Sequence, residues 1–433
     1  MSGLVGLFAF DSRWNVSRFL YFSLKGVQNR GQETAGLTVS DLSDMRSIRG
    51  VGLVEEVLKE REIEKLGGPI GIAAVSADKT VMPFTAKRLA MGFNGCMLDP
   101  KDDVQNLFSE LSGGTGLGAG NGTGNGKGRE IEEIAQVLER RQILGSLVGM
   151  GNDCLFAYRD PHGLRPLLKG NLGFDLALIS SELGAMDTIG SDFFFDVEPG
   201  ELCYFNKYGF EKERIKKENP RYCAFEYIYL SRPDNVWNGV HMEDVRYRIG
   251  QKMAQENPPD TNNSVVIAVP ETARPFANGF SDEAGIPQRL GFESVGRQLR
   301  TAIIPSQFER MMGIQLKHNV IRSAVYGKKV YVLDDSVVRG NTMRNTVFWL
   351  RKRGAKEVHI RIGSPHLISP CRYGIEVPIR DELIAAHNSE EEIAKVIDAD
   401  SFAYLSPESV VGCVGLPEKE MCMACMTGEY PFW

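Results

Sequence analysis

The chain has 433 residues, of which 42% are hydrophobic, which is enough for two domains with complete apolar cores. Its net charge is −6 and it contains no basic block, so nucleic acid is excluded as the main partner. No apolar run reaches membrane-spanning length and no signal pattern opens the chain. The eight cysteines are therefore expected in a reducing compartment, the cytoplasm, where they bind a metal or fill apolar cores.

The first domain is expected to span residues 1–215 and to have a layered α+β fold. An apolar strand starts directly after Ser2, and a helix is predicted over Val16–Gln28. Because Ser2 is small, we expect removal of Met1 to leave Ser2 as the N-terminal residue. Further short strands are expected at 35–39, 70–75, 88–93 and 93–97. Many short strands with Gly and Pro turns and few helices are typical of this fold class.

A glycine-rich tract, Gly113–Gly128, interrupts this domain. A nucleotide-binding loop would need an apolar strand leading directly into it, and none precedes this tract. Its dense, irregular glycines indicate a flexible surface connection instead. A helix over Glu130–Arg141 and a strand over Ser146–Gly151 are predicted to follow it.

The second domain is expected at 216–400, after a charged stretch, with a tail at 401–433 that packs on it. Strands that alternate with helices predict a parallel sheet. The expected elements are a strand and turn at Cys223–Asn235, a helix at His241–Asn257, and strands at Val265–Pro270, Val330–Leu333 and Val358–Pro365. The ends of these last three strands would then converge on one ligand.

The stretch Lys329–Thr342 carries the most specific pattern in the chain, K-V-Y-V-L-D-D-S-V-V-R-G-N-T. A buried strand leads into two carboxylates, Asp334 and Asp335, and then into a loop that opens a helix. Backbone N–H groups at a helix N-terminus favour a phosphate. The carboxylates can accept hydrogen bonds from sugar hydroxyls or bind a hard cation such as Mg²⁺. Taken singly, the acids could be a solvated strand end; their order with the loop predicts a site for a sugar 5-phosphate.

This string resembles the phosphoribosyl-pyrophosphate (PRPP) signature of the phosphoribosyltransferases. From Cys223 to the C-terminus, the chain resembles the synthase domain of the amidophosphoribosyltransferase family, a type I phosphoribosyltransferase domain with a parallel sheet. The resemblance implies that Thr272, in V-P-E-T-A-R-P, helps to bind Mg²⁺ and pyrophosphate, and that Asp334 and Asp335 hold the metal and the ribose hydroxyls. It implies that the 5-phosphate is cradled by Ser336, Gly340, Asn341 and Thr342.

Two catalytic residues are implied by the same resemblance. Lys317, in L-K-H-N-V-I-R, matches a family lysine that reaches the pyrophosphate, and Arg300-Thr301 align with the R-T of the family's mobile catalytic loop. Much of the remaining loop, within Glu293–Gln307, differs from the family pattern. In the family that loop closes the site and helps to form an ammonia passage, so this coupling role is in doubt here.

The first domain resembles the glutaminase half of the same family, which has the N-terminal-nucleophile hydrolase fold. The matching segments are R-G-Q-E-T-A-G-L, R-D-P-H-G-L-R-P and D-V-E-P-G-E. In the family an N-terminal cysteine attacks glutamine with its own α-amine as the base, but Ser2 stands at that position. The family's G-H-V-R-Y-S-T, whose arginine holds the glutamine carboxylate, corresponds to Gly71–Thr80, without its His and Arg. Asn94 and Gly95 remain from the H-N-G oxyanion segment. We interpret this domain as a glutaminase that has lost its activity.

Four cysteines lie in matching segments of the second half: Cys223, Cys371, Cys422 and Cys425. Cys422 and Cys425 form a C-x-x-C pair, which by itself is compatible with zinc, a redox pair or coincidence. In one branch of the family, cysteines at these four places bind a [4Fe–4S] cluster. Four thiolates suit that cluster or zinc. We expect the cluster, in a structural role that fastens the tail to the second domain.

Three functions are compatible with these patterns. The first is a PRPP amidotransferase that forms 5-phosphoribosylamine, the first step of purine synthesis, from ammonia that is free or supplied by a separate glutaminase subunit. The second is a non-catalytic PRPP-binding or regulatory subunit that assembles with an active paralogue. The third, a salvage phosphoribosyltransferase acting on a base, is disfavoured by the family resemblance through the tail. The family suggests a homo- or hetero-oligomer.

Overall fold

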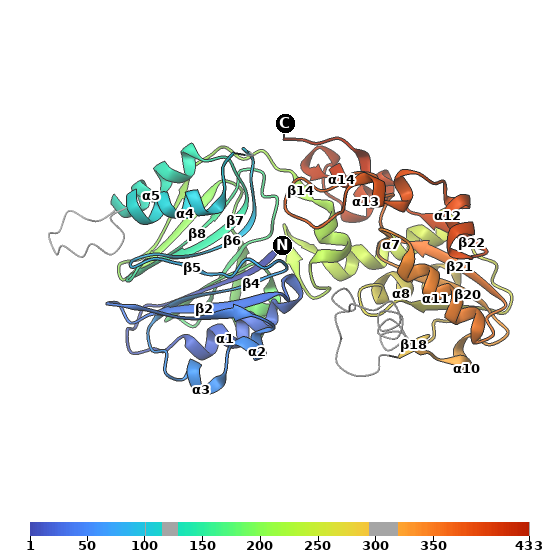
Figure 1. Ribbon diagram of the computed structural model, residues 1–433, viewed down its shortest axis with the longest axis horizontal. Coiled ribbons are helices and arrows are strands. Elements are labelled where there is room, and N and C mark those ends of the chain that lie inside the picture. The colour runs from blue at the N-terminus through green and yellow to red at the C-terminus, as the bar shows by residue number, and fades with distance from the viewer. Residues whose placement is uncertain (100, 115–128, 294–318, 433) are drawn as a thin grey trace.

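The computed structural model describes residues 1–99, 101–114, 129–293 and 319–432. The chain forms two halves that lie side by side, with the N-terminus between them (Figure 1). The first half contains two antiparallel sheets, and the second contains a parallel sheet covered by helices. No helix in the described part of the chain is both long and apolar enough to cross a membrane.

The first sheet has seven strands in the order β11-β9-β10-β1-β4-β2-β3. Its neighbouring strands pair antiparallel, and β1 lies at the centre between β10 and β4. The strands are β1 (Ser2–Ala9), β2 (Thr34–Ser40), β3 (Met45–Val51), β4 (Ile70–Ser76), β9 (Leu168–Leu172), β10 (Leu176–Ser180) and β11 (Phe193–Asp196). The helices of this layer are α1 (Ser17–Gly26), α2 (Val54–Val57), α3 (Glu60–Ile63) and α6 (Leu183–Asp187).

The second sheet has six strands in the order β13-β12-β8-β7-β6-β5 and packs against the first. Apolar side chains of both inner faces, such as Leu4 from β1 and Leu147 from β7, share one core. The strands are β5 (Phe84–Thr85), β6 (Ala90–Met97), β7 (Ile143–Met150), β8 (Cys154–Arg159), β12 (Glu201–Asn206) and β13 (Gly209–Arg214). Helices α4 (Val104–Gly114) and α5 (Arg129–Arg140) cover the outer face (Figure 1). This helix–sheet–sheet–helix layering is the expected α+β fold.

The second half is built on a parallel sheet with the strand order β17-β20-β21-β22. Its strands are β17 (Ser264–Ala268), β20 (Lys329–Asp334), β21 (Glu357–Ile362) and β22 (Ser401–Tyr404). The helices are α7 (Met242–Glu256), α8 (Arg274–Ala284), α10 (Arg322–Val325), α11 (Asn341–Lys352), α12 (Glu390–Ile397), α13 (Pro407–Val414) and α14 (Ala424–Thr427). Short pairs complete it: β14 (Tyr222–Cys223) with β23 (Met421–Cys422), β15 (Val236–Trp237) with β16 (Val240–His241), and β18 (Phe292–Glu293) with β19 (Asn319–Val320). The predicted parallel α/β fold is confirmed.

One predicted element is wrong in kind, and two others are merged. A strand and turn were expected at Cys223–Asn235, but only Tyr222–Cys223 pairs, and Glu226–Leu230 forms a π-helix, η2. A short, mostly buried apolar run has no periodicity that separates a strand from a helix. The two segments expected at 88–93 and 93–97 are one strand, β6, which stays paired through Gly95 because Gly95 lies directly opposite Gly145.

The tail expected from residue 401 differs at its start, because Ser401–Tyr404 is β22, the fourth strand of the parallel sheet. Only four residues long, this strand gives too short a pattern to recognise in the sequence. Further along, β23 pairs in parallel with β14 and brings Cys422 opposite Cys223. Of the glycine-rich tract, Gly113 and Gly114 close α4 and residues 115–128 lie outside the described part of the chain. The domain limits at 215 and 400 stay predictions; β13 ends at Arg214.

Candidate functional site

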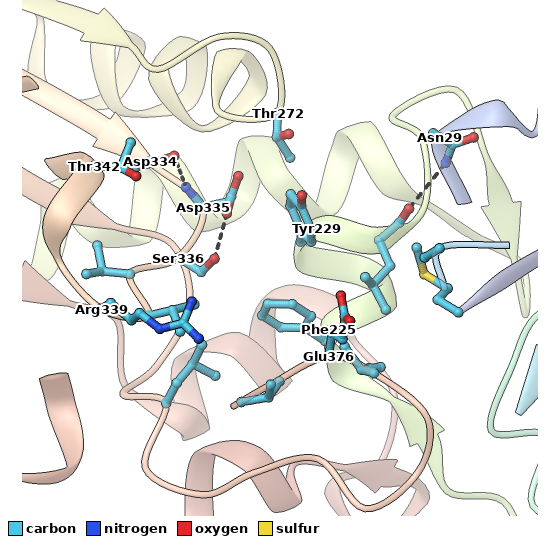
Figure 2. Close-up of a pocket in the computed structure, with 18 of the residues that line it drawn as sticks. Asn29, Phe225, Tyr229, Thr272, Asp334, Asp335, Ser336, Arg339, Thr342 and Glu376 are labelled. Atoms are coloured by element: carbon cyan, nitrogen blue, oxygen red, sulfur yellow. Dashed lines mark hydrogen bonds between the residues drawn. The ribbon is translucent and has the colours of Figure 1, made fainter. Parts of the chain in front are cut away.

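A cavity of about 1130 Å³ lies between the two halves, and both contribute to its walls. The second half contributes Thr272 after β17, the acid pair after β20, and the loop that opens α11. The first half contributes Met1 and Asp78 from the ends of β1 and β4. Figure 2 shows the acid pair facing this space. The carboxyl ends of the parallel strands thus meet the open end of the first sheet.

The acid pair sits at the end of β20 with little solvent around it. Asp335 is 8% exposed; it accepts a hydrogen bond from the Ser336 hydroxyl at 2.8 Å, and its own N–H donates to Asp334 Oδ1 at 2.9 Å (Figure 2). Burial raises the pKa of Asp335 to about 6, against the hydrogen bond from Ser336 and the positive charge of Arg246. Burial and then the charge of Asp335 raise the pKa of Asp334 well above its usual range. Two adjacent carboxylates that repel each other are stabilised by a bound cation.

The loop after the acid pair leads directly into α11. Gly340 has φ +76° and forms the N-cap of this helix; a side chain there would approach Ile384 Cδ1 to 2.8 Å. Only glycine adopts this conformation without strain. The loop residues named from the sequence, Ser336, Gly340, Asn341 and Thr342, all line the cavity. The helix N-terminus therefore presents its free N–H groups to the space that also contains the acid pair.

Other parts of the cavity wall were not found from the sequence. Phe225 and Tyr229 project from the two ends of η2, and Glu376 projects from the loop after Cys371 (Figure 2). Burial, then the charges of Asp335 and Asp334, raise the pKa of Tyr229. The C-A-F-E-Y-I-Y run contains both aromatic residues, but its apolar pattern does not show that their side chains border a cavity.

Ser2 follows Met1, which lines the cavity, and is itself held in β1 and almost fully buried. Its N–H donates to Asn94 Oδ1 at 3.0 Å, and its hydroxyl lies 3.5 Å from that of Ser76, which donates to Asp78 at 2.9 Å. The structure therefore brings the predicted Ser2, Asn94 and Gly95 together, since Gly95 follows Asn94 in β6. Within the described part of the chain, the amide nitrogen of Asn94 has no hydrogen-bond partner.

The positions that would carry the family's histidine and arginine are apolar and inaccessible. Ile72 and Ala74 lie in the middle of β4, each 1% exposed, in the core between the two sheets. Neither side chain can bind a carboxylate. The nearest charged residue of this stretch is Asp78, whose pKa is lowered because its hydrogen bonds with Thr80 and Ser76 outweigh burial. An anionic side chain on this wall disfavours the carboxylate of an amino acid.

The four cysteines named from the sequence come together beside the first domain. Cys223 and Cys422 pair across β14 and β23, and the carbonyl of Cys425 accepts two N–H bonds from the segment before Cys371. Burial raises the pKa of Cys422 to about 11 and of Cys223 to about 12, with the neighbouring thiols adding to the shift. Arg165 opposes both shifts. The sequence thus identified a real group of neighbouring thiols, of which those of Cys223, Cys422 and Cys425 are buried and that of Cys371 is half-buried.

The spacing of these sulfur atoms bears on what they could bind. Among the described residues, the only potential ligands that come in a group of three within 4.8 Å are Glu130, Asp153 and Cys154, so no three of the four sulfurs are that close. A tetrahedral zinc with Zn–S bonds of about 2.3 Å would hold its sulfurs about 3.8 Å apart. An iron–sulfur cluster holds its cysteine sulfurs farther apart, because each binds a different iron atom.

Lys317 and Arg300 lie outside the described residues, so their predicted catalytic roles stay predictions. The roles proposed for Thr272, the acid pair and the phosphate loop also stay predictions. Their positions around one cavity are now established.

A buried ion-pair group between the halves was also missed. Arg30 pairs with Glu182 and with Glu226 on η2, each at 2.7 Å, and all three side chains are fully buried. A single acid inside the apolar run C-A-F-E-Y-I-Y was a usable signal, because an acid in such a run needs a buried partner.

The chain was compared with known proteins. No family model matches it. It is 37% identical to an amidophosphoribosyltransferase of Methanocaldococcus jannaschii, covering 100% of this chain and 98% of that protein. It is 36% identical to that of Methanothermobacter thermautotrophicus, covering 99% and 94%. The solved structure of glutamine PRPP amidotransferase from B. subtilis, complexed with ADP and GMP, matches with a TM-score of 0.85 at 32% identity, over 99% of this chain and 97% of that one. The chain therefore belongs to the amidophosphoribosyltransferase family.

Proposed function

We propose that this enzyme converts PRPP and ammonia into 5-phosphoribosylamine and pyrophosphate, the first step of purine synthesis, and that it does not hydrolyse glutamine itself. The observation that carries the proposal is the contrast between the PRPP corner and the segment around Ser2. The PRPP corner keeps the acid pair and a glycine-capped phosphate loop. The first domain has Ser2 at the nucleophile position and buried Ile72 and Ala74 at the positions of the substrate clamp. Ammonia is then free or comes from a separate glutaminase subunit.

The residues at the PRPP corner suit this displacement. The N–H groups at the start of α11 hold the 5-phosphate, and Asp334 and Asp335 orient the ribose hydroxyls. The nitrogen lone pair of ammonia forms a bond to ribose C1, the bond from C1 to the pyrophosphate oxygen breaks with its electron pair, and the nitrogen then loses a proton to solvent. Asp334, Asp335 and Thr272 would hold Mg²⁺, which would neutralise charge on the departing pyrophosphate.

We also propose that Cys223, Cys371, Cys422 and Cys425 hold a [4Fe–4S] cluster, with zinc as the alternative. The gathering of these four cysteines, with Cys223, Cys422 and Cys425 buried and Cys371 half-buried, supports a bound metal group. Because Cys422 and Cys425 belong to the tail and Cys223 to the start of the second domain, the cluster would have a structural role. It would fasten the C-terminus beside the parallel sheet.

One assay tests the reaction. The purified protein is mixed with PRPP and Mg²⁺ and either ammonium or glutamine, and pyrophosphate is measured. We expect turnover with ammonium and none with glutamine. PRPP binding without turnover would instead indicate a regulatory subunit that works with an active paralogue. Turnover with glutamine by the protein alone would refute the loss of the glutaminase.

A further inference from the structure

The ion-pair group between the halves is fully buried and joins the two domains directly. Arg30, at the end of the helical segment after β1, donates to Glu182 from the first half and, through both terminal nitrogens, to Glu226 on η2. Arg165 forms a third ion pair, in which its Nη1 lies 3.4 Å from Glu226 Oε1. All four side chains are at most 1% exposed. Such charges are stable in an interior only when each is paired.

On the side of the first domain, this group reaches the N-terminal strand. Arg30 Nε donates to the carbonyl oxygen of Ser2 at 3.2 Å. On the side of the second domain, Ser231 donates from its hydroxyl to Glu226 at 2.9 Å, and its carbonyl accepts from Arg246 Nη2 at 2.6 Å. Arg246 Nε donates to the carbonyl of Tyr227 at 3.0 Å, so η2 is held at two of its backbone groups.

The far end of this path is the PRPP corner. Arg246 is fully buried, and its remaining nitrogen Nη1 has no partner within the described residues. Between Arg30 and Arg246, η2 presents Phe225 and Tyr229 to the cavity (Figure 2). An unbroken series of contacts therefore runs from the β1 carbonyl to the helix that forms one wall of the PRPP corner.

The charges along the path balance only with the first domain in place. Burial raises the pKa of Glu226, but the positive charge and hydrogen bonds of Arg30 lower it by more. The pKa of Glu226 therefore lies below its usual range, and Glu226 is a buried anion. Without Arg30, this anion would keep the Ser231 hydroxyl and, as its only charged partner, Arg165 at 3.4 Å. The cost of burying the poorly paired anion would then displace Glu226, and η2 with it. An enzyme that no longer used its glutaminase chemistry would still need this arginine.

We propose that Arg30 is a positioning residue for PRPP: through Glu226 it fixes η2, which lines the cavity together with the acid pair, and the first domain is retained as a wall of the PRPP site. This inference rests on the proposed function, because it assumes that the corner binds PRPP. It assigns to the first domain a role in the reaction that does not depend on glutamine.

The test compares PRPP binding, measured by titration calorimetry with Mg²⁺, in wild type, Arg30→Met, Glu226→Gln and the double variant. We expect Arg30→Met to weaken PRPP binding at least tenfold and to raise KM for PRPP, while KM for ammonium stays within twofold. The double variant removes the unpaired anion and should recover most of the affinity. Arg232→Ala, which breaks the exposed pair with Asp234 just beyond η2, is the matched control and should bind PRPP like wild type.

Wild-type affinity in Arg30→Met would overturn the proposal, as would a weakened Arg30→Met that the second substitution does not improve. If Arg30→Met does not fold, Arg30→Lys replaces it; it keeps the charge but loses the two-pronged contact, and unchanged PRPP binding there would also overturn the proposal. Absence of PRPP binding in wild type would instead refute the proposed function, so the two failures are distinguishable.

Discussion

The PRPP corner and the segment around Ser2 lie on equally regular scaffolds but differ in their chemistry. At the PRPP corner, the strand β20, the acid pair and the glycine-capped helix are all present. Around Ser2, β1, β4 and β6 keep their antiparallel register, yet Ile72 and Ala74 occupy the positions expected to carry the clamp. Strand pairing and core packing do not depend on the side chains that bind a substrate. The proposed loss of glutaminase activity is therefore compatible with an intact first domain, provided that something else requires the fold.

The largest effect that separates these two regions is expected at Asp335. Asp335→Asn removes one of the two charges that face the cation and the ribose, so ammonium-dependent turnover should fall by about 100-fold or more. Steady-state pyrophosphate release measures this. Asp260→Asn is the control, because Asp260 pairs with Lys329 at the opposite end of β20. A loss of less than about fivefold in Asp335→Asn would contradict the assignment of this corner.

The next effect concerns the four cysteines. Cys425→Ser should abolish the brown colour of anaerobically purified protein and lower the melting temperature by about 5 °C or more, because a buried ligand set would lose its metal. Absorbance, iron analysis and thermal unfolding measure these changes. Cys413→Ser is the control, since Cys413 is buried in α13 apart from the other four. A colourless wild-type protein that contains zinc would contradict the cluster.

The parallel sheet and the PRPP corner could be predicted from the sequence because their signals are local. An apolar strand, two acids, and a glycine before a helix are neighbours in the chain, and strand ends of a parallel sheet converge by construction. The four cysteines were identified for a different reason, through a family resemblance. Their spacing in the sequence alone would not have identified them as one group. Their approach depends on the β14–β23 pairing between Tyr222–Cys223 and Met421–Cys422, almost 200 residues apart in the chain.

The parts that could not be predicted depend on contacts between distant segments. The Arg30–Glu226 pair joins residues 196 positions apart, and neither residue shows in its own segment which partner it has. The π-helix η2 was predicted as a strand because its short run of mostly buried apolar residues has no clear periodicity. The positions of Tyr229 and Phe225 on the cavity wall became evident only in the structure. Long-range pairing of buried charges is the information that a single sequence does not contain.

A smaller effect follows from the pKa of Asp335. Burial raises this pKa to about 6 in the ligand-free protein, so the carboxyl is mostly ionised at pH 7.5 and mostly protonated at pH 5. Cation binding requires the ionised form, and affinity for Mg²⁺ with PRPP should fall by about tenfold per pH unit below pH 6. Calorimetric titration at pH 7.5, 6.5 and 5.5 checks this dependence.

The raised pKa of Asp335 has a second consequence: as the pH rises, the ligand-free protein loses stability, although its affinity for the cation increases. A carboxyl with a raised pKa binds its proton more tightly in the folded than in the unfolded state. Its contribution therefore destabilises the fold as the pH rises from about 4 to 6, by on the order of 2 kcal/mol. Chemical unfolding across this range measures the slope, and Asp335→Asn, which cannot titrate, should lack this component. Equal slopes in both proteins would contradict the raised pKa.

The smallest effects are expected around Ser2. Ser2→Ala removes only a 3.5 Å contact between hydroxyls, so ammonium-dependent turnover should stay within about twofold of wild type. Ser2→Cys supplies the nucleophile of the family but not its clamp, because Ile72 and Ala74 remain in the core and Asp78 repels a carboxylate. Glutamine should therefore drive no pyrophosphate release in this variant either, since a nucleophile without an oriented substrate accelerates little. If Ser2→Cys instead gained glutamine-dependent turnover, the absence of a thiol at position 2 would by itself explain why the wild-type protein does not use glutamine. The buried Ile72 and Ala74 of β4 would then not be the cause.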